Sequence, residues 1–148
     1  MNKYFWLPVL ALWLTACGAA NAAAEPKNPG PKPGTVTVEI VYLNHPPLRP
    51  VLQDVEKLLA TYGGRVSGAW YDFDTPRGAD FAKAKGLTGH TPLAIFVNGS
   101  MDFKVDGRAV KFYSFPQGYD MGMGMVTDGD WTVQDLQHVL DQATAKTP

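Results

Sequence analysis

The segment that most constrains the fold runs from Gly86 to Gly99. It contains a glycine-rich loop, a Thr-Pro step, the apolar run 93–97 and the dipeptide Asn98-Gly99. A short, continuous apolar run that ends at an Asn-Gly dipeptide is typical of a buried strand followed by a tight hairpin turn. We therefore expect residues 93–97 to form a core strand.

Hydrophobic patterns on either side of this segment predict the other elements. β-branched and aromatic alternation indicates strands, and amphipathic stripes with capping residues indicate helices. The expected strands are 35–43, 65–73, 93–97 and 101–115, the last with a turn at Asp106-Gly107. The expected helices are 48–62, 76–85 and 132–145, and residues 116–130 are expected to form a loop. This order, βαβαββα, predicts an α/β domain over residues 35–148, with a mixed central sheet flanked by helices.

The N-terminal segment has the features of a targeting signal. Residues 1–16 contain one lysine and an apolar stretch too short to span a membrane comfortably. Leu14-Thr15-Ala16-Cys17 resembles the lipobox of bacterial lipoproteins. The resemblance implies that Cys17 is lipidated, with palmitate for example, and becomes the first residue of the mature chain. An ordinary secretory signal with a chance cysteine is the alternative interpretation.

The same resemblance predicts where the protein resides. Gly18 rather than Asp follows the cysteine, which by the sorting rules of that family implies the outer membrane, facing the periplasm. Residues 17–34 are rich in Ala, Pro and Gly, a composition that favours extended conformations and cannot bury a core. We expect them to tether the folded domain to the lipid anchor of the cell envelope.

The predicted domain resembles the thioredoxin-like fold. The resemblance is carried by the element order, by His90-Thr91-Pro92 with the Asn98-Gly99 exit, and by Pro50 in the first helix. It implies a cis peptide bond before Pro92, a helix kink at Pro50, and a loop at 90–92 that lies beside the loop after the first strand.

The redox motif of that family is missing. Where the family has Cys-x-x-Cys, this chain has Asn44-His45-Pro46-Pro47, and its one cysteine is Cys17. Thiol–disulfide exchange requires a thiolate, so we expect no oxidoreductase, cysteine peroxidase or glutathione transferase activity. A histidine general base, or a ligand site at Asp72 and Asp74, is a weaker enzymatic alternative.

The leading hypothesis is therefore a non-catalytic binding or interaction module. The expected cleft, with Tyr42 and Trp70 near it, would accept an extended peptide from an unidentified protein partner. Its lining residues would be His45, Pro46, Pro47, His90, Thr91 and Pro92. With 13 basic and 14 acidic side chains and no basic run, the sequence does not indicate a nucleic-acid partner.

Copper is the one cofactor that the sequence suggests. Imidazole and thioether groups together suit copper(I), and the loop after residue 116 contains three methionines alternating with glycine. The candidate ligands are His45, His90, Met121, Met123 and Met125. The chain then resembles thioredoxin-fold copper-delivery proteins in part, since those use cysteines that are missing here. A flexible flap over an apolar surface is the other interpretation of the methionines.

Overall fold

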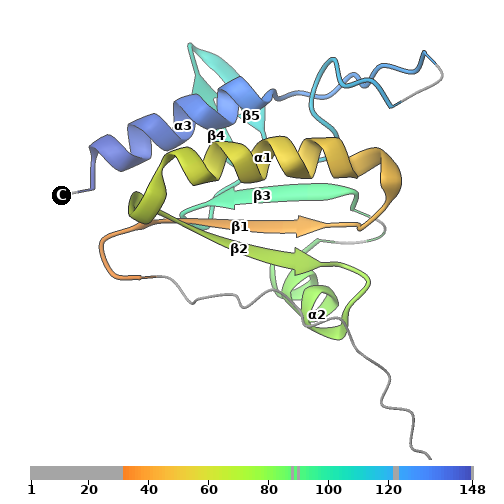
Figure 1. Ribbon diagram of the computed structural model, residues 1–148, viewed down its shortest axis with the longest axis horizontal. Coiled ribbons are helices and arrows are strands. Elements are labelled where there is room, and N and C mark those ends of the chain that lie inside the picture. Colours follow the sequence, from red (N-terminus) through yellow and green to blue (C-terminus); the bar gives the residue numbers. More distant parts are fainter. Residues whose placement is uncertain (1–31, 88, 90, 122–123, 148) are drawn as a thin grey trace, which may run out of the picture.

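The computed structural model describes residues 32–87, 89, 91–121 and 124–147. It is a mixed α/β structure (Figure 1). The strands are β1 (Val36–Tyr42), β2 (Val66–Asp72), β3 (Leu93–Val97), β4 (Asp102–Val105) and β5 (Arg108–Lys111). The α-helices are α1 (Arg49–Thr61), α2 (Pro76–Ala84) and α3 (Val133–Ala145), and the 3₁₀ turns are η1 (Pro46–Leu48) and η2 (Gly63–Arg65).

The main sheet has three strands in the order β2-β1-β3. β1 is parallel to β2 and antiparallel to β3, so that Ile40 lies opposite Trp70 on one side and Ile95 on the other. Figure 1 shows α1 and α3 on one face of this sheet and α2 on the other. β1 therefore has buried side chains on both faces, with Val38 and Ile40 on one face and Val41 on the other.

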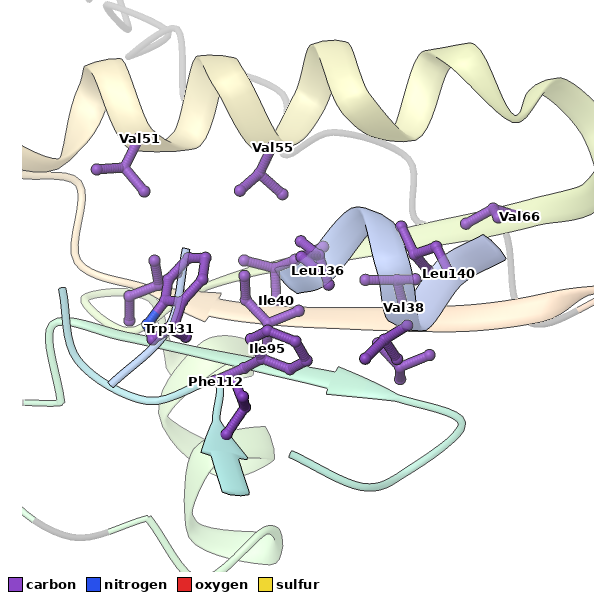
Figure 2. Packing of buried hydrophobic residues seen from close by; sticks show 14 of the residues in the cluster. Val38, Ile40, Val51, Val55, Val66, Ile95, Phe112, Trp131, Leu136 and Leu140 are labelled. Atoms are coloured by element: carbon purple, nitrogen blue, oxygen red, sulfur yellow. The ribbon is translucent and has the colours of Figure 1, made fainter. Parts of the chain in front are cut away.

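The core between the sheet and the α1/α3 layer is formed by aliphatic side chains together with Tyr62, Phe112 and Trp131, and Figure 2 shows part of it. Val51 and Val55 of α1 point toward the sheet, and the rings of Phe112 and Trp131 meet edge to face with centroids 5.6 Å apart. Full burial of one such side chain contributes about 1.5–3 kcal/mol. The buried set also includes Val38, Ile40, Val66, Ile95, Leu136 and Leu140.

Both predicted hairpin turns are confirmed. Asn98 and Gly99 have φ values of 49° and 83°, and Asp106 and Gly107 have 50° and 81°. Two successive residues with positive φ are the requirement of a type I′ turn, which Asn-Gly and Asp-Gly satisfy at low cost.

The expectation that all of residues 101–115 extend the main sheet is wrong. β4 and β5 pair with each other in a separate two-stranded sheet, and the chain returns to β3 only at residues 112–114. There Ile95 N donates to Phe112 O at 2.9 Å and Ser114 N donates to Leu93 O at 2.8 Å. The hairpin leaves the sheet because Val105 and Val110 are buried in the core on the α3 side.

The helix starts follow the predicted capping residues. Thr75 accepts a hydrogen bond from Gly78 N at 3.1 Å, and Pro76 occupies the first turn of α2. Thr132 and Asp135 form a reciprocal capping box at the start of α3. α1 begins one residue later than expected because Pro46–Leu48 form a 3₁₀ turn before it.

Two implications of the thioredoxin-like resemblance do not match the structure. The described residues, which include Thr91 and Pro92, contain no cis peptide bond, and a trans X-Pro bond is the lower-energy form by about 0.5–1 kcal/mol. Pro50 lies in the first turn of α1, where a missing N–H removes no helical hydrogen bond and no kink is required.

Candidate functional site: a groove between α1 and β2

The loop after β1 and the loop before β3 lie side by side. Leu43 N donates to Pro92 O at 3.0 Å, and Tyr42 and Leu93 are register partners. The antiparallel pairing of β1 with β3 brings the end of one strand to the start of the other. The described residues of the predicted cleft therefore lie at this end of the sheet.

His45 and the prolines that follow it are exposed. His45 Nε2 lies 3.8 Å from Asp74 Oδ2, just before α2, and both side chains are more than half exposed. The backbone carbonyl of His45 accepts from Leu48 N at 3.0 Å, closing the 3₁₀ turn. An exposed pair of this kind contributes little to stability, so His45 is available at the surface.

Thr91 and Pro92 are less accessible than the sequence suggested. Thr91 is fully buried, with its hydroxyl 3.3 Å from the hydroxyl of Tyr113, and Pro92 is half-buried. His90 lies outside the described residues, as do Cys17 and Met123.

We call residues 121–125 the methionine loop. A backbone hydrogen bond from Met121 N to Met125 O, at 2.8 Å, joins its two ends. Met125 and Val126 are the most exposed large apolar side chains of the described residues, at 54% and 64%. In the described part of the chain, no three His, Cys, Asp or Glu side chains cluster as metal ligands would.

A tyrosine that precedes this loop connects the chain to α1. Tyr119 donates its hydroxyl to Asp54 Oδ2 at 2.9 Å. Burial and this hydrogen bond raise the pKa of Tyr119 to about 12. The hydrogen bonds from Tyr119 and Lys57 lower the pKa of Asp54. Figure 1 shows the loop at the end of the sheet where β1 and β2 finish.

A groove of about 330 Å³ opens between α1 and the edge strand β2, and we call it the α1/β2 groove. Its α1 wall consists of Arg49, Leu52, Gln53 and Glu56. These positions are i, i+3, i+4 and i+7, which form one stripe on a helix. The stripe lies next to the apolar stripe that carries Val51 and Val55 into the core.

The other wall is aromatic. Tyr42, Asn44 and Trp70 complete the lining of the groove. The rings of Tyr42 and Trp70 meet edge to face, with centroids 6.0 Å apart and planes at 80°. Tyr42 is the last residue of β1 and pairs with Asp72 of β2 in the parallel register. Trp70 lies two residues before Asp72 on β2. Both are half-buried, so they present apolar ring surface to the groove.

The groove has a charge at each end of its α1 wall. Arg49 and Glu56 are both exposed, and neither forms an ion pair within the described residues. Seven helical residues correspond to about 10.5 Å along the axis. The α1/β2 groove therefore combines an apolar aromatic wall with a cation and an anion that stand seven residues apart on α1.

A small hollow of about 20 Å³ adjoins the groove on the α2 side and shares Tyr42 and Trp70 with it. The guanidinium of Arg77 lies 5.3 Å from the centroid of Tyr71 there. This hollow is too small for a ligand.

Sequence reasoning placed Tyr42 and Trp70 near the site but missed the α1 wall. The sequence does contain the pattern of this wall. A second set of residues recurs at helical spacing beside the apolar stripe, namely Arg49, Leu52, Gln53 and Glu56. Three of these four residues are polar, and polar residues on a surface helix usually contact water only, so the spacing alone did not single them out.

Comparison with known proteins adds no functional information: the chain matches no family model, and no match is found among curated proteins. Within the part of the chain that the structure describes, no helix has the length and apolar character needed to cross a bilayer.

Proposed function

We propose that this protein is a redox-inactive, thioredoxin-like binding module of the bacterial envelope, lipid-anchored through Cys17, that binds extended peptide segments of a protein partner. Cys17 is the chain's one thiol, and lipidation would consume it. The assigned role is therefore recognition rather than thiol chemistry.

The arrangement of the sheet supports the thioredoxin-like assignment. A central β1 parallel to β2 and antiparallel to β3 accompanies helices on both faces. Residues 112–114 adjoin β3 on its other edge. The separate β4–β5 hairpin departs from a simple continuation of the sheet.

The α1/β2 groove is the observation that carries the binding proposal. It lies beside the start of α1, where a redox motif would stand in the resembled fold. Its volume falls within the range of about 300–1,000 Å³ that is common for ligand sites. Tyr42 and Trp70 offer rigid aromatic surface, and Asn44 and Gln53 offer amide groups for peptide hydrogen bonds.

The test is a selection of peptides from a random display library against the full chain in detergent, followed by NMR of the indole N–H groups. We expect selected peptides to shift the Trp70 resonance and to leave that of Trp131 unchanged, because Trp131 is fully buried. Trp70→Ala should abolish binding without unfolding the domain, as judged by circular dichroism. Failure to select any peptide that shifts Trp70 would refute the proposal.

Copper(I) binding is the second candidate function. The Met121–Met125 backbone hydrogen bond brings two thioether residues together at the neck of one loop, which supports it. In a copper(I) competition titration, replacing Met121, Met123 and Met125 together with Leu should weaken binding at least about tenfold. His45→Ala with His90→Ala should also weaken it. Equal affinity in the methionine variant would remove those residues from any site.

A further inference from the structure

We propose that the α1/β2 groove selects polyproline-type peptides in which an acidic and a basic residue stand three positions apart. This inference rests on the proposed peptide-binding function and adds the chemistry of the partner. It is carried by the charges at the two ends of the α1 wall and by the aromatic pair opposite them.

The charges define what the two ends of the groove prefer. Arg49 favours a carboxylate and Glu56 favours an ammonium or guanidinium group, and neither charge is satisfied by an ion pair in the described residues. A ligand of single charge would meet one attractive and one repulsive end. A ligand with both charges would meet two attractive ends.

The positions of Arg49 and Glu56 on α1 set the spacing that we expect between the ligand's charges. Their backbones are seven residues apart, which is a rise of about 10.5 Å along the helix axis. A polyproline II helix rises about 3.1 Å per residue with three residues per turn, so residues i and i+3 lie on one side and about 9.3 Å apart. In a β-strand, residues on one side are instead about 7 or 13 Å apart.

The aromatic wall of the groove is suited to proline rings. Tyr42 and Trp70 line the groove opposite α1, and aromatic-lined grooves are the usual docking sites of polyproline II segments. The backbone carbonyls of such a segment have no internal hydrogen bonds. The side-chain amides of Asn44 and Gln53 in the groove lining can donate to them.

The test compares capped, fluorescently labelled peptides by anisotropy with the full chain in detergent. The probes carry Glu-Pro-Pro-Lys, Glu-Pro-Pro-Glu or Lys-Pro-Pro-Lys between glycines, and two further probes place Glu and Lys two or four positions apart. We expect Glu-Pro-Pro-Lys to bind at least about threefold more tightly than each of the others, with a preference that decreases at high salt.

Single charge reversals should then switch the preference. Glu56→Lys should bind Glu-Pro-Pro-Glu best, and Arg49→Glu should bind Lys-Pro-Pro-Lys best. Asp80→Lys, at an exposed position of α2 on the opposite face of the sheet, is the matched control and should keep the original preference. Because both groove substitutions are at exposed positions of α1, we expect the variants to fold.

The outcomes separate this inference from the proposed function. If library-selected peptides shift Trp70 but the five probes bind equally, the charge-spaced ligand is wrong and peptide binding stands. If Glu56→Lys leaves the order of affinities unchanged, the inference is also wrong. If no peptide of any kind perturbs Trp70, both proposals fail.

Discussion

Replacing Asp135 with Asn should destabilise the domain and remove part of its acid sensitivity. The Asp135 side chain is only 9% exposed. Its Oδ1 accepts from Arg108 Nη2 at 2.7 Å, and its Oδ2 accepts from Thr132 N at 2.8 Å and from Thr132 Oγ1 at 2.9 Å. An asparagine side chain has one acceptor oxygen, so it can accept from Arg108 or from Thr132 but not from both as the carboxylate does.

The magnitude follows from the two interactions that the substitution weakens. A hydrogen bond between charged groups contributes about 1.5–3 kcal/mol, and the lower end applies here because Arg108 is half exposed and water can replace the carboxylate. The capping contact adds about 0.5–1 kcal/mol. We therefore expect a loss of about 2 kcal/mol near neutral pH, which corresponds to a decrease in Tm of about 8 °C for a domain of this size.

The pH dependence distinguishes this explanation from a simple packing defect. Burial alone would raise the pKa of Asp135, but the hydrogen bonds from Arg108 and Thr132 outweigh it and lower the pKa. A depressed pKa stabilises the folded state above the ordinary value of 3.8, and this stabilisation is lost as the pH falls through the folded-state pKa. The difference between wild type and Asp135→Asn should therefore be largest near neutral pH and decrease in acid.

Urea unfolding followed by circular dichroism, at about pH 7 and at about pH 2.5, measures this difference. Asp54, whose pKa is also lowered, is present in both proteins, so its contribution cancels in the comparison. Asp80→Asn, an exposed carboxylate without an ion pair in the described residues, is the control and should change little. A difference for Asp135→Asn that is equal at both pH values would refute the reasoning.

Three further predictions concern other contacts. Gly78→Ala should destabilise the domain by more than about 2 kcal/mol in urea unfolding, because the added Cβ would stand 1.8 Å from the carbonyl oxygen of Asp72; wild-type stability would refute this close approach. Tyr119→Phe should speed proteolysis at the methionine loop, since it removes the hydrogen bond to Asp54; an unchanged cleavage rate would show that this bond does not restrain the loop. Cys17→Ser should abolish metabolic labelling with palmitate and release the protein from the membrane fraction; labelling that persists would contradict lipidation at Cys17.

Local features of the fold were predictable because each is encoded by a few neighbouring residues. The Asn98-Gly99 and Asp106-Gly107 turns need positive φ at successive positions, and the caps at Thr75 and Thr132 need a hydroxyl before a helix. The five-residue apolar run identified β3 as the strand buried along its whole length.

Features that depend on distant residues were not predictable. Alternation in residues 101–115 indicated strands but not their partners, because the burial of Val105 and Val110 under α3 decides where the hairpin packs. The α1/β2 groove likewise depends on the parallel register that places Trp70 next to Tyr42. Neither residue carries a motif, so the sequence could suggest their proximity only through the resembled fold.

The start of α1 bears on the proposal that this end of the sheet serves recognition rather than thiol chemistry. A helix N-terminus stabilises a thiolate or another anion through its free N–H groups. Here the N–H of Arg49 already donates to Pro46 O, and Pro50 has no N–H to offer. The positive charge at this site is supplied instead by the Arg49 side chain on the wall of the groove. The backbone at Arg49 and Pro50 therefore offers no free donor to an anion, which supports the proposal that the Arg49 side chain orients a charged ligand here.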